Sequence, residues 1–248
     1  MPRLLSLVAV AAFMLLSWGS PANSAQALST AQTASVNKLI HDYILAHPEV
    51  VFQALQEGQQ KADAAKAAAD QSALAQHQKE LLHDPNSPVL GNPNGMVTLV
   101  EFFDYRCPYC KSSAGTVTEL IRSDPNLRVV MKEFPVLGPE SVFASRIALA
   151  AWHHGKYAAF HDAVLAYKGA LDNGKTLDIA RSLGLDPDQL QKEAADAAIT
   201  ANIQADLDLA QTLDIDGTPT FVIGNAIIPG VVSLDDLKQA VADARAKP

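Results

Sequence analysis

The only two cysteines of this 248-residue chain lie two residues apart, and their chemistry is the first question the sequence raises. Cys107 and Cys110 belong to the stretch FFDYRCPYCK, residues 102–111. A CxxC pair can cycle between dithiol and disulfide, or it can supply thiolate ligands to a soft metal ion. A disulfide across so short a loop stabilises a fold only slightly, which argues against a purely structural role. We therefore expect redox chemistry or metal binding at this pair.

The residues around the cysteines predict that the pair lies at the junction between a strand and the helix that follows it. Residues 97–103 are a run of β-formers, and from Cys107 onward apolar residues recur at helical spacing. Pro108 suits a first helical turn, where its missing N–H has no partner. The positive end of the helix dipole stabilises an anionic sulfur. We predict that Cys107 is an exposed attacking thiolate and that Cys110, one turn deeper, is the resolving thiol.

The remaining apolar patterns predict an α/β domain with a helical insertion. Strands are expected at residues 97–103, 127–134, 220–223 and 226–228, with helical signals filling the interval between the second and third of them. Ser233 is expected to cap a final helix. Proline and glycine punctuate residues 84–95, so the domain is predicted to span 84–248, with its helical insertion at about 138–198.

Ahead of that domain, residues 28–83 are predicted to form a helical extension. Residues 36–44 carry an amphipathic stripe, Pro48 can start a second helix, and residues 61–82 form an Ala-rich polar stem. The stripe is too narrow to make a core, and short helices are marginal in water without a partner. We therefore expect residues 28–57 to associate with copies of themselves, as a dimer or trimer.

The first 27 residues have the pattern of a cleavable signal peptide. Arg3 precedes an apolar stretch from Leu4 to Trp18, and small residues between Ser24 and Ala27 offer cleavage sites. A membrane anchor is the alternative, but the apolar stretch is shorter than the roughly 20 residues that a spanning helix needs. We predict export to the periplasm, where disulfides can persist.

Composition narrows the possible partners. The net charge of −8 argues against a general nucleic-acid binder, which needs a basic surface. His153, His154 and His161 could prompt a metal assignment, but adjacent histidines on one helix point about 100° apart and chelate poorly. We expect neither a metal ion nor another cofactor.

Three motifs together resemble one known family. Glu101–Cys110, Lys132–Pro135 and Gly217–Phe221 are similar to those of the DsbA-like thiol-disulfide oxidoreductases, over about residues 88–246. The resemblance implies a thioredoxin-like fold with an inserted helical domain. The N-terminal extension looks most like that of the suppressor-of-copper-sensitivity (ScsC-type) periplasmic disulfide isomerases, in which the extension mediates oligomerisation. The implied partners are exported proteins with cysteines and a membrane protein that reduces or reoxidises the enzyme.

The resemblance also implies roles for residues around the cysteines. Thr218-Pro219 would form a cis-proline loop that faces the pair and binds the substrate backbone, together with Pro108 and Tyr109. Glu101 matches a buried acid of the family. We expect Lys132, on the neighbouring strand, to pair with Glu101 and the two to relay the proton of Cys110, a plain salt bridge being the alternative.

Two questions stay open at the level of sequence. Oxidases, reductases and isomerases share this site and differ in reduction potential and partner, although the extension favours an isomerase. A Cu(I)-binding protein that uses the same two thiolates is the rival, because soft sulfur ligands suit that ion. Tyr105 and Arg106, which flank the pair, either shape substrate contact or are simply exposed.

Overall fold

The computed structural model describes residues 28–246, which divide into two compact units between Gln59 and Gln60. The expected signal peptide lies outside the described residues. Among the helices at residues 28–246, none is both long and apolar enough to cross a membrane. The two units are described separately below.

The first unit consists of helix α1 (Thr30–Ala46) and the beginning of α2 (Pro48–Gln76). Ser29 caps α1 because its hydroxyl accepts from the Gln32 N–H at 3.3 Å, while the Gln32 side chain accepts from the Ser29 N–H at 2.9 Å. Every described residue up to Gln59 is exposed. The exposed set includes these large apolar side chains: Leu28, Val36, Leu39, Ile40, Tyr43, Ile44, Leu45, Val50, Val51, Phe52 and Leu55.

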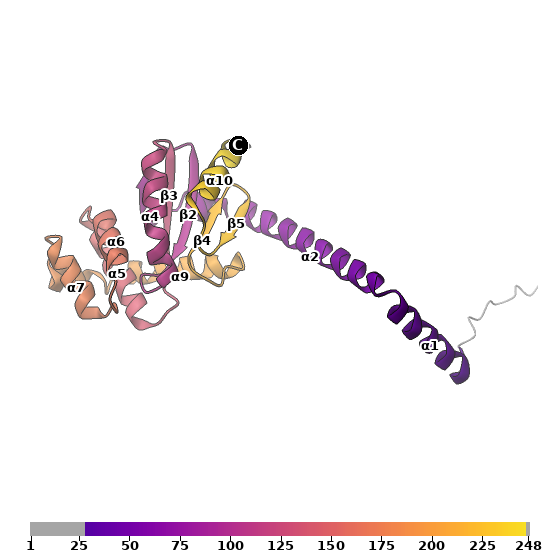
Figure 1. Ribbon diagram of the computed structural model, residues 1–248. Helices are drawn as coiled ribbons and strands as arrows, with labels where there is room; N and C mark the ends of the chain where they lie inside the picture. Colours follow the sequence, from indigo (N-terminus) through magenta and orange to yellow (C-terminus); the bar gives the residue numbers. More distant parts are fainter. Residues whose placement is uncertain (1–27, 247–248) are drawn as a thin grey trace, which may run out of the picture. The chain divides into compact units, whose positions relative to one another are not determined.

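The second unit is built on a five-stranded sheet in the order β1-β3-β2-β4-β5 (Figure 1). The strands are β1 (Val89–Gly91), β2 (Val97–Phe103), β3 (Leu127–Glu133), β4 (Thr220–Ile223) and β5 (Ala226–Pro229). β2 and β3 run parallel in the register Glu101 to Met131, and every other neighbouring pair is antiparallel. The two central strands are buried on both faces, which agrees with their continuous apolar sequence.

Alternate residues of these strands face two different cores. Leu99 and Phe103 of β2 pack on the face covered by α4 (Pro108–Ser123) and α10 (Leu234–Ala246). Val100 and Phe102 point the other way, into a smaller core beneath α9 (Ala197–Thr212), α3 (Gln78–Leu82) and the end of α2. Each side chain of β2 and β3 therefore lies on one of the two faces of the sheet, and each face has its own core.

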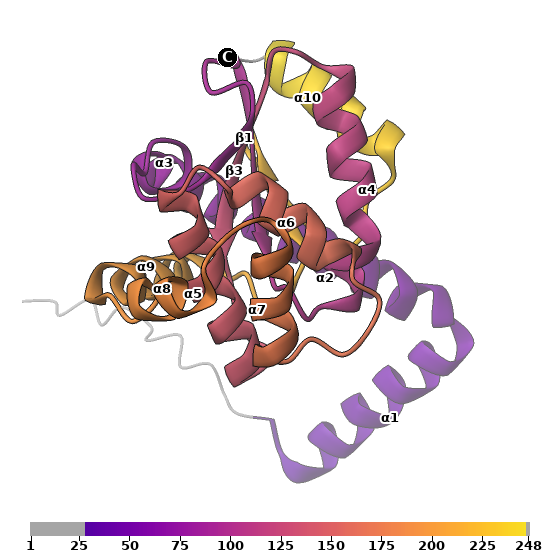
Figure 2. The same ribbon diagram turned by 90° about the vertical axis from the view of Figure 1, so that its left-hand side faces the viewer.

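The helical insertion comprises α5 (Pro139–His153), α6 (Tyr157–Ala166), α7 (Asn173–Ser182) and α8 (Pro187–Glu193). Figure 2 shows these helices gathered together, and α5 packs against each of the others. They occupy the interval expected at about 138–198. The thioredoxin-like fold with inserted helices is thus confirmed.

Two features of the second unit differ from expectation. The short edge strand β1 was not predicted, because three residues that follow Pro88 and end in Gly91 carry little periodic signal. The predicted boundary near residue 84 also differs from the observed one, because Leu74 and Leu81 are buried in the smaller core. These isolated leucines pack the end of the Ala-rich segment onto the sheet of the second unit, whereas a polar spacer was expected.

Candidate active site

Cys107 lies at the N-cap of α4, after a turn that leads out of β2. Asp104 fixes this turn: its buried carboxylate accepts from the Arg106 N–H at 2.7 Å, from the Leu137 N–H at 3.0 Å and from the Ser141 hydroxyl at 2.8 Å. Pro108 takes the first helical position, as predicted. The turn therefore positions the first cysteine at the positive end of a 16-residue helix.

Both cysteines are free thiols in this structure, and both are largely buried. Cys107 is 4% exposed and Cys110 is 0% exposed, so the expectation of an exposed Cys107 is wrong in this conformation. Burial is the main cause that raises the pKa of Cys110 far above its usual value, and the negative charges of Cys107 and Glu101 raise it further. The second thiol therefore holds its proton unless a nearby base removes it.

A loop 111 residues further along the chain covers the first sulfur. The Thr218–Pro219 peptide bond is cis, as the resemblance implied. The Cys107 thiol donates to the Thr218 carbonyl oxygen across 3.2 Å, and the Gly230 N–H donates to the Pro219 carbonyl oxygen at 2.8 Å. The loop and the dithiol thus meet at one place, although they are remote in sequence.

Exposed apolar side chains surround this meeting point. Tyr109 of α4 is 65% exposed, and Val136, Leu137 and Val231 are also exposed. The Leu137 carbonyl accepts from the Arg106 guanidinium at 2.9 Å, which ties its loop to the cysteine turn. Val231 follows Gly230, which is bonded to the proline loop. Together these side chains form an apolar rim that can contact a bound polypeptide.

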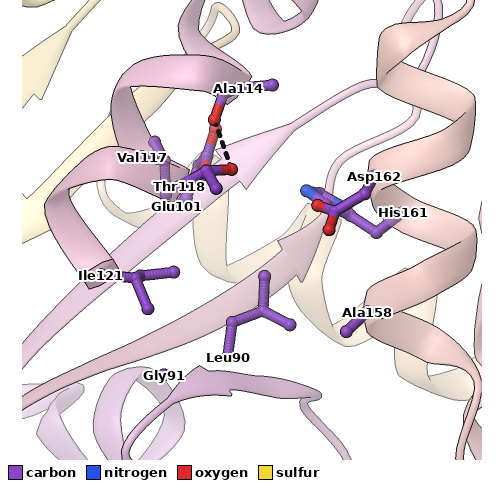
Figure 3. Close-up of a pocket in the computed structure, with 10 residues that line it drawn as sticks. All are labelled: Leu90, Gly91, Glu101, Ala114, Val117, Thr118, Ile121, Ala158, His161 and Asp162. Carbon is purple, nitrogen blue, oxygen red and sulfur yellow. Dashed lines mark hydrogen bonds between the residues drawn. The ribbon is translucent and has the colours of Figure 1, made fainter. Parts of the chain in front are cut away.

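Glu101 lies in β2 on the same side of the sheet as α4, in the direction of Cys110. Burial raises the pKa of its carboxyl from 4.5 to about 8. Among residues 28–246, no group hydrogen-bonds this carboxylate in the structure, and the side chain borders a small cavity (Figure 3). A buried acid that titrates near neutral pH is well suited to exchange protons with a neighbouring thiol.

Lys132 does not pair with Glu101, contrary to the expectation from sequence. In β3 the residue opposite Glu101 is Met131, so Lys132 points to the other face of the sheet. There its ammonium group lies 2.9 Å from a carboxylate oxygen of Asp84 and 2.9 Å from one of Asp206, and donates to the Ser87 hydroxyl at 2.8 Å. The lysine is part of a buried ionic cluster away from the thiols.

The two residues that flank the pair have defined places. Tyr105 is buried, and its hydroxyl lies 3.4 Å from a Glu133 carboxylate oxygen and 3.3 Å from Nδ1 of His161. Arg106 forms an ion pair with Glu140 at 2.7 Å. Tyr105 therefore supports the interior of the site and cannot contact a substrate in this conformation.

His153, His154 and His161 do not form a recognisable metal site. His154 pairs with Glu193 at 2.7 Å, whereas His161 is buried, with its pKa lowered to about 3 by burial. Within residues 28–246 no group of three or more potential ligands from histidine, cysteine, aspartate and glutamate comes together. His161 belongs to the core, where it lines the same small cavity as Glu101.

Sequence reasoning missed Asp104 and the apolar rim. Asp104 sits inside the FFDYRCPYC motif, and an acid between a strand and a helix start is a usable signal for a turn that needs N–H acceptors. The rim residues come from the start of α4 and from two loops, and only the fold brings them together.

The fold and the site define a class: thioredoxin-fold proteins with a CxxC dithiol at a helix start and a cis-proline loop opposite. A family model described as a DSBA-like thioredoxin domain matches residues 98–242, and the chain belongs to this family, which groups thiol-disulfide oxidoreductases. A second model, described as the copper resistance protein ScsC N-terminal domain, matches residues 32–65. The ScsC-type resemblance of the extension is thereby confirmed.

Solved structures agree with this assignment. A thioredoxin-like oxidoreductase from Silicibacter pomeroyi is 48% identical, with a TM-score of 0.67, and the match covers 68% of this chain and 98% of that one. A linker-deletion mutant of ScsC from Proteus mirabilis is 30% identical, with a TM-score of 0.69, and the match covers 91% of this chain and 100% of that one.

Curated relatives include larger proteins. A Na(+)/H(+) antiporter NhaA 1 from Salinispora arenicola is 33% identical over 158 residues, which is 63% of this chain and 24% of the antiporter. The chain thus spans about a quarter of the length of the curated relatives it matches first.

Proposed function

We propose that the protein is a periplasmic thiol-disulfide oxidoreductase that makes or reshuffles disulfides in exported proteins, with isomerisation as its main activity. The observation that carries the proposal is the contact between the Cys107 sulfur and the Thr218 carbonyl oxygen, at 3.2 Å. A reactive sulfur and an adjacent backbone carbonyl that an extended chain can pair with are the two groups that exchange with a substrate disulfide requires.

The proposed cycle uses three reacting side chains, those of Cys107, Cys110 and Glu101, and a surface that binds the substrate. The Cys107 thiolate attacks a substrate disulfide and forms a mixed disulfide, while the Thr218 backbone and the apolar rim hold the extended substrate. Cys110 then passes its proton to Glu101 and attacks the Cys107 sulfur, which releases the substrate thiolate. A nearby base is needed because burial holds the proton on Cys110.

Isomerisation is supported by the first unit. The exposed apolar side chains of α1 and early α2 extend through residues 28–57, and copies of this surface can cover one another in a dimer or trimer. Several Cys107 sites facing one bound chain would favour reshuffling over a single oxidation. The match of residues 32–65 to the ScsC N-terminal domain supports the same reading.

A Cu(I)-binding role is the second candidate, and the observation in its favour is that the same N-terminal match is to a domain of a copper resistance protein. Residues 32–65 contain no cysteine, so any thiolate ligands would have to be Cys107 and Cys110. The proline loop and the apolar rim serve a polypeptide substrate and have no part in a two-sulfur metal site. We therefore rank disulfide exchange first.

The test is to trap the mixed disulfide. We expect Cys110→Ser to accumulate covalent complexes with scrambled substrate proteins, because its Cys107 thiolate can still attack their disulfides and its resolving thiol is gone. Cys107→Ser should form none. The opposite pattern would reverse the two roles, and the absence of complexes with both variants would argue against thiol exchange.

A further inference from the structure

A cavity of about 190 Å³ lies between α4, α6 and the strands β1 and β2. Figure 3 shows Glu101 on one side of the cavity and His161 and Asp162 of α6 on the other, and the polar atoms of His161 and Asp162 face the side on which Glu101 lies. Apolar side chains form much of the remaining wall, among them Leu90, Val117 and Ile121. The cavity joins the buried acid of the site to a carboxylate at the surface.

The size of the cavity decides what it can hold. It is smaller than the roughly 300 Å³ at which small-molecule sites begin, but at about 30 Å³ each it has room for about six water molecules. Glu101, Asp162 and the Thr118 hydroxyl, which donates to the Ala114 carbonyl at 2.9 Å, provide polar partners. Water is therefore the occupant that fits this volume and this wall.

The charged and titratable groups around the cavity leave one route for a proton. His161 stays neutral, since burial lowers its pKa to about 3, and its Nδ1 already faces the Tyr105 hydroxyl at 3.3 Å. α4 contributes Cys110 behind Glu101, and β1 contributes no titratable side chain to the lining. Asp162 is the remaining acid. It is exposed, and partial burial raises its pKa above the usual value.

We propose that Asp162 exchanges protons between bulk water and Glu101 through the water of this cavity. The proposal rests on the proposed function and adds a relay residue to it. When Cys110 resolves a mixed disulfide, its S–H proton moves to the Glu101 carboxylate and the thiolate attacks the Cys107 sulfur. The Cys107–Cys110 bond forms, the bond from Cys107 to the substrate breaks, and the substrate sulfur leaves with the electron pair. The proton on Glu101 then passes through water to Asp162 and to solvent, and the reverse path reprotonates Cys110.

The experiment isolates the resolving step. The mixed disulfide between Cys107 and 5-thio-2-nitrobenzoate is formed on the full mature chain, and release of the coloured thiolate is followed by stopped flow in dilute buffer. We expect Asp162→Asn to slow release by about tenfold, less than the roughly hundredfold or greater effect of losing a direct general base. Added acetate or imidazole should restore the rate, because a small buffer can take over the relay.

Two further variants separate relay from structure. Asp208→Asn removes the same charge from an exposed position on α9, where an amide oxygen can still accept from Gln204, and it should behave as the parent. Ala158→Leu narrows the cavity from α6 and should also slow release, without rescue by buffer.

Each outcome is decisive. An Asp162→Asn variant with the rate of the parent, or one slowed equally at every buffer concentration, would overturn the relay and leave the thiol chemistry intact. A parent protein that forms the mixed disulfide but never releases the thiolate would overturn the proposed function itself, and the relay with it.

Discussion

Glu101 shows how one buried carboxyl couples the stability of the fold to the chemistry of the site. The folded state binds the proton of this group more tightly than the unfolded chain does, because burial raises the pKa to about 8. Its contribution to stability is complete below the unfolded pKa, about 4.5, and is lost as the pH rises through about 8. The burial of this carboxyl therefore lowers the free energy of unfolding progressively as the pH rises from about 4.5 to about 8.

Glu101→Gln should remove this pH dependence. We expect the free energy of unfolding of the variant, relative to the parent, to rise between pH 4.5 and 8 by up to roughly 4 kcal/mol, since each pKa unit corresponds to about 1.4 kcal/mol. The same variant should release substrate from the mixed disulfide more slowly. Urea unfolding at pH 5 and pH 8 measures the first effect. The difference between variant and parent isolates Glu101, because Glu133, whose pKa is also about 8, is present in both. A difference that does not vary with pH would show that Glu101 titrates normally.

The incorrect prediction of a pair between Glu101 and Lys132 also has its cause at the scale of single residues. The sequence places Glu101 and Lys132 at corresponding points of two central strands, but a register offset of one residue moves a side chain to the opposite face. Continuous apolar strands give no alternation from which that register could be read. Cys107, Cys110 and the proline loop were predictable because each has its own local chemical signature.

At the scale of elements, the cluster around Lys132 joins parts of the chain that are distant in sequence. Asp84 precedes the sheet, Lys132 lies in β3, and Asp206 lies in α9, where its carboxylate also accepts from the Glu133 N–H at 3.0 Å. The lysine and Asp206 side chains are each 2% exposed. The cluster therefore fixes α9 and the entry to the domain on the face opposite the thiols.

Lys132→Met should destabilise the second unit without disabling the dithiol. Removing one partner of a buried ion pair typically costs about 3–5 kcal/mol, because the other charges are left unpaired. The loss should be smaller at acid pH, since burial already raises the pKa of Asp206 to about 6 and protonation removes its charge. Urea unfolding at pH 5 and pH 7.5 tests this.

The matched control adds Asp84→Asn and Asp206→Asn to Lys132→Met, which should recover much of the lost stability. If the Lys132→Met variant instead has normal stability but resolves mixed disulfides slowly, the lysine acts in the active site.

The elements themselves were largely predictable. The strands at 97–103 and 220–223 were predicted with their observed limits, because apolar β-formers end there at turn residues. The burial of Leu74 and Leu81 could not be predicted. The residues they pack against lie on the second face of the sheet, and the sequence alone does not show that this face lies next to the Ala-rich helix.

At the scale of the whole molecule, the first unit carries the proposed assembly. Deleting residues 28–57 removes its exposed apolar side chains and none of the residues of the site. We expect the intact mature protein to be a dimer or trimer by light scattering at micromolar concentration, and the truncated form to be a folded monomer. The monomer should still oxidise dithiols but should reactivate a scrambled disulfide protein poorly.

Two results would contradict this picture in different ways. A monomeric intact protein would remove the assembly altogether. A monomeric truncated form that unscrambles substrates as well as the parent would separate isomerisation from assembly and leave the thiol chemistry in place.

The carbonyl of Thr218 that holds the Cys107 thiol has a further consequence, for chemical damage. Peroxides convert exposed, reactive cysteines to sulfenic acid and then irreversibly to sulfinic and sulfonic acids. In the resting dithiol form only 4% of Cys107 is open to solvent, and the carbonyl lies against its sulfur. An extended polypeptide that binds this loop competes for the same backbone group and so uncovers the sulfur as it arrives. The sulfur is thereby shielded from small oxidants until the substrate is in place.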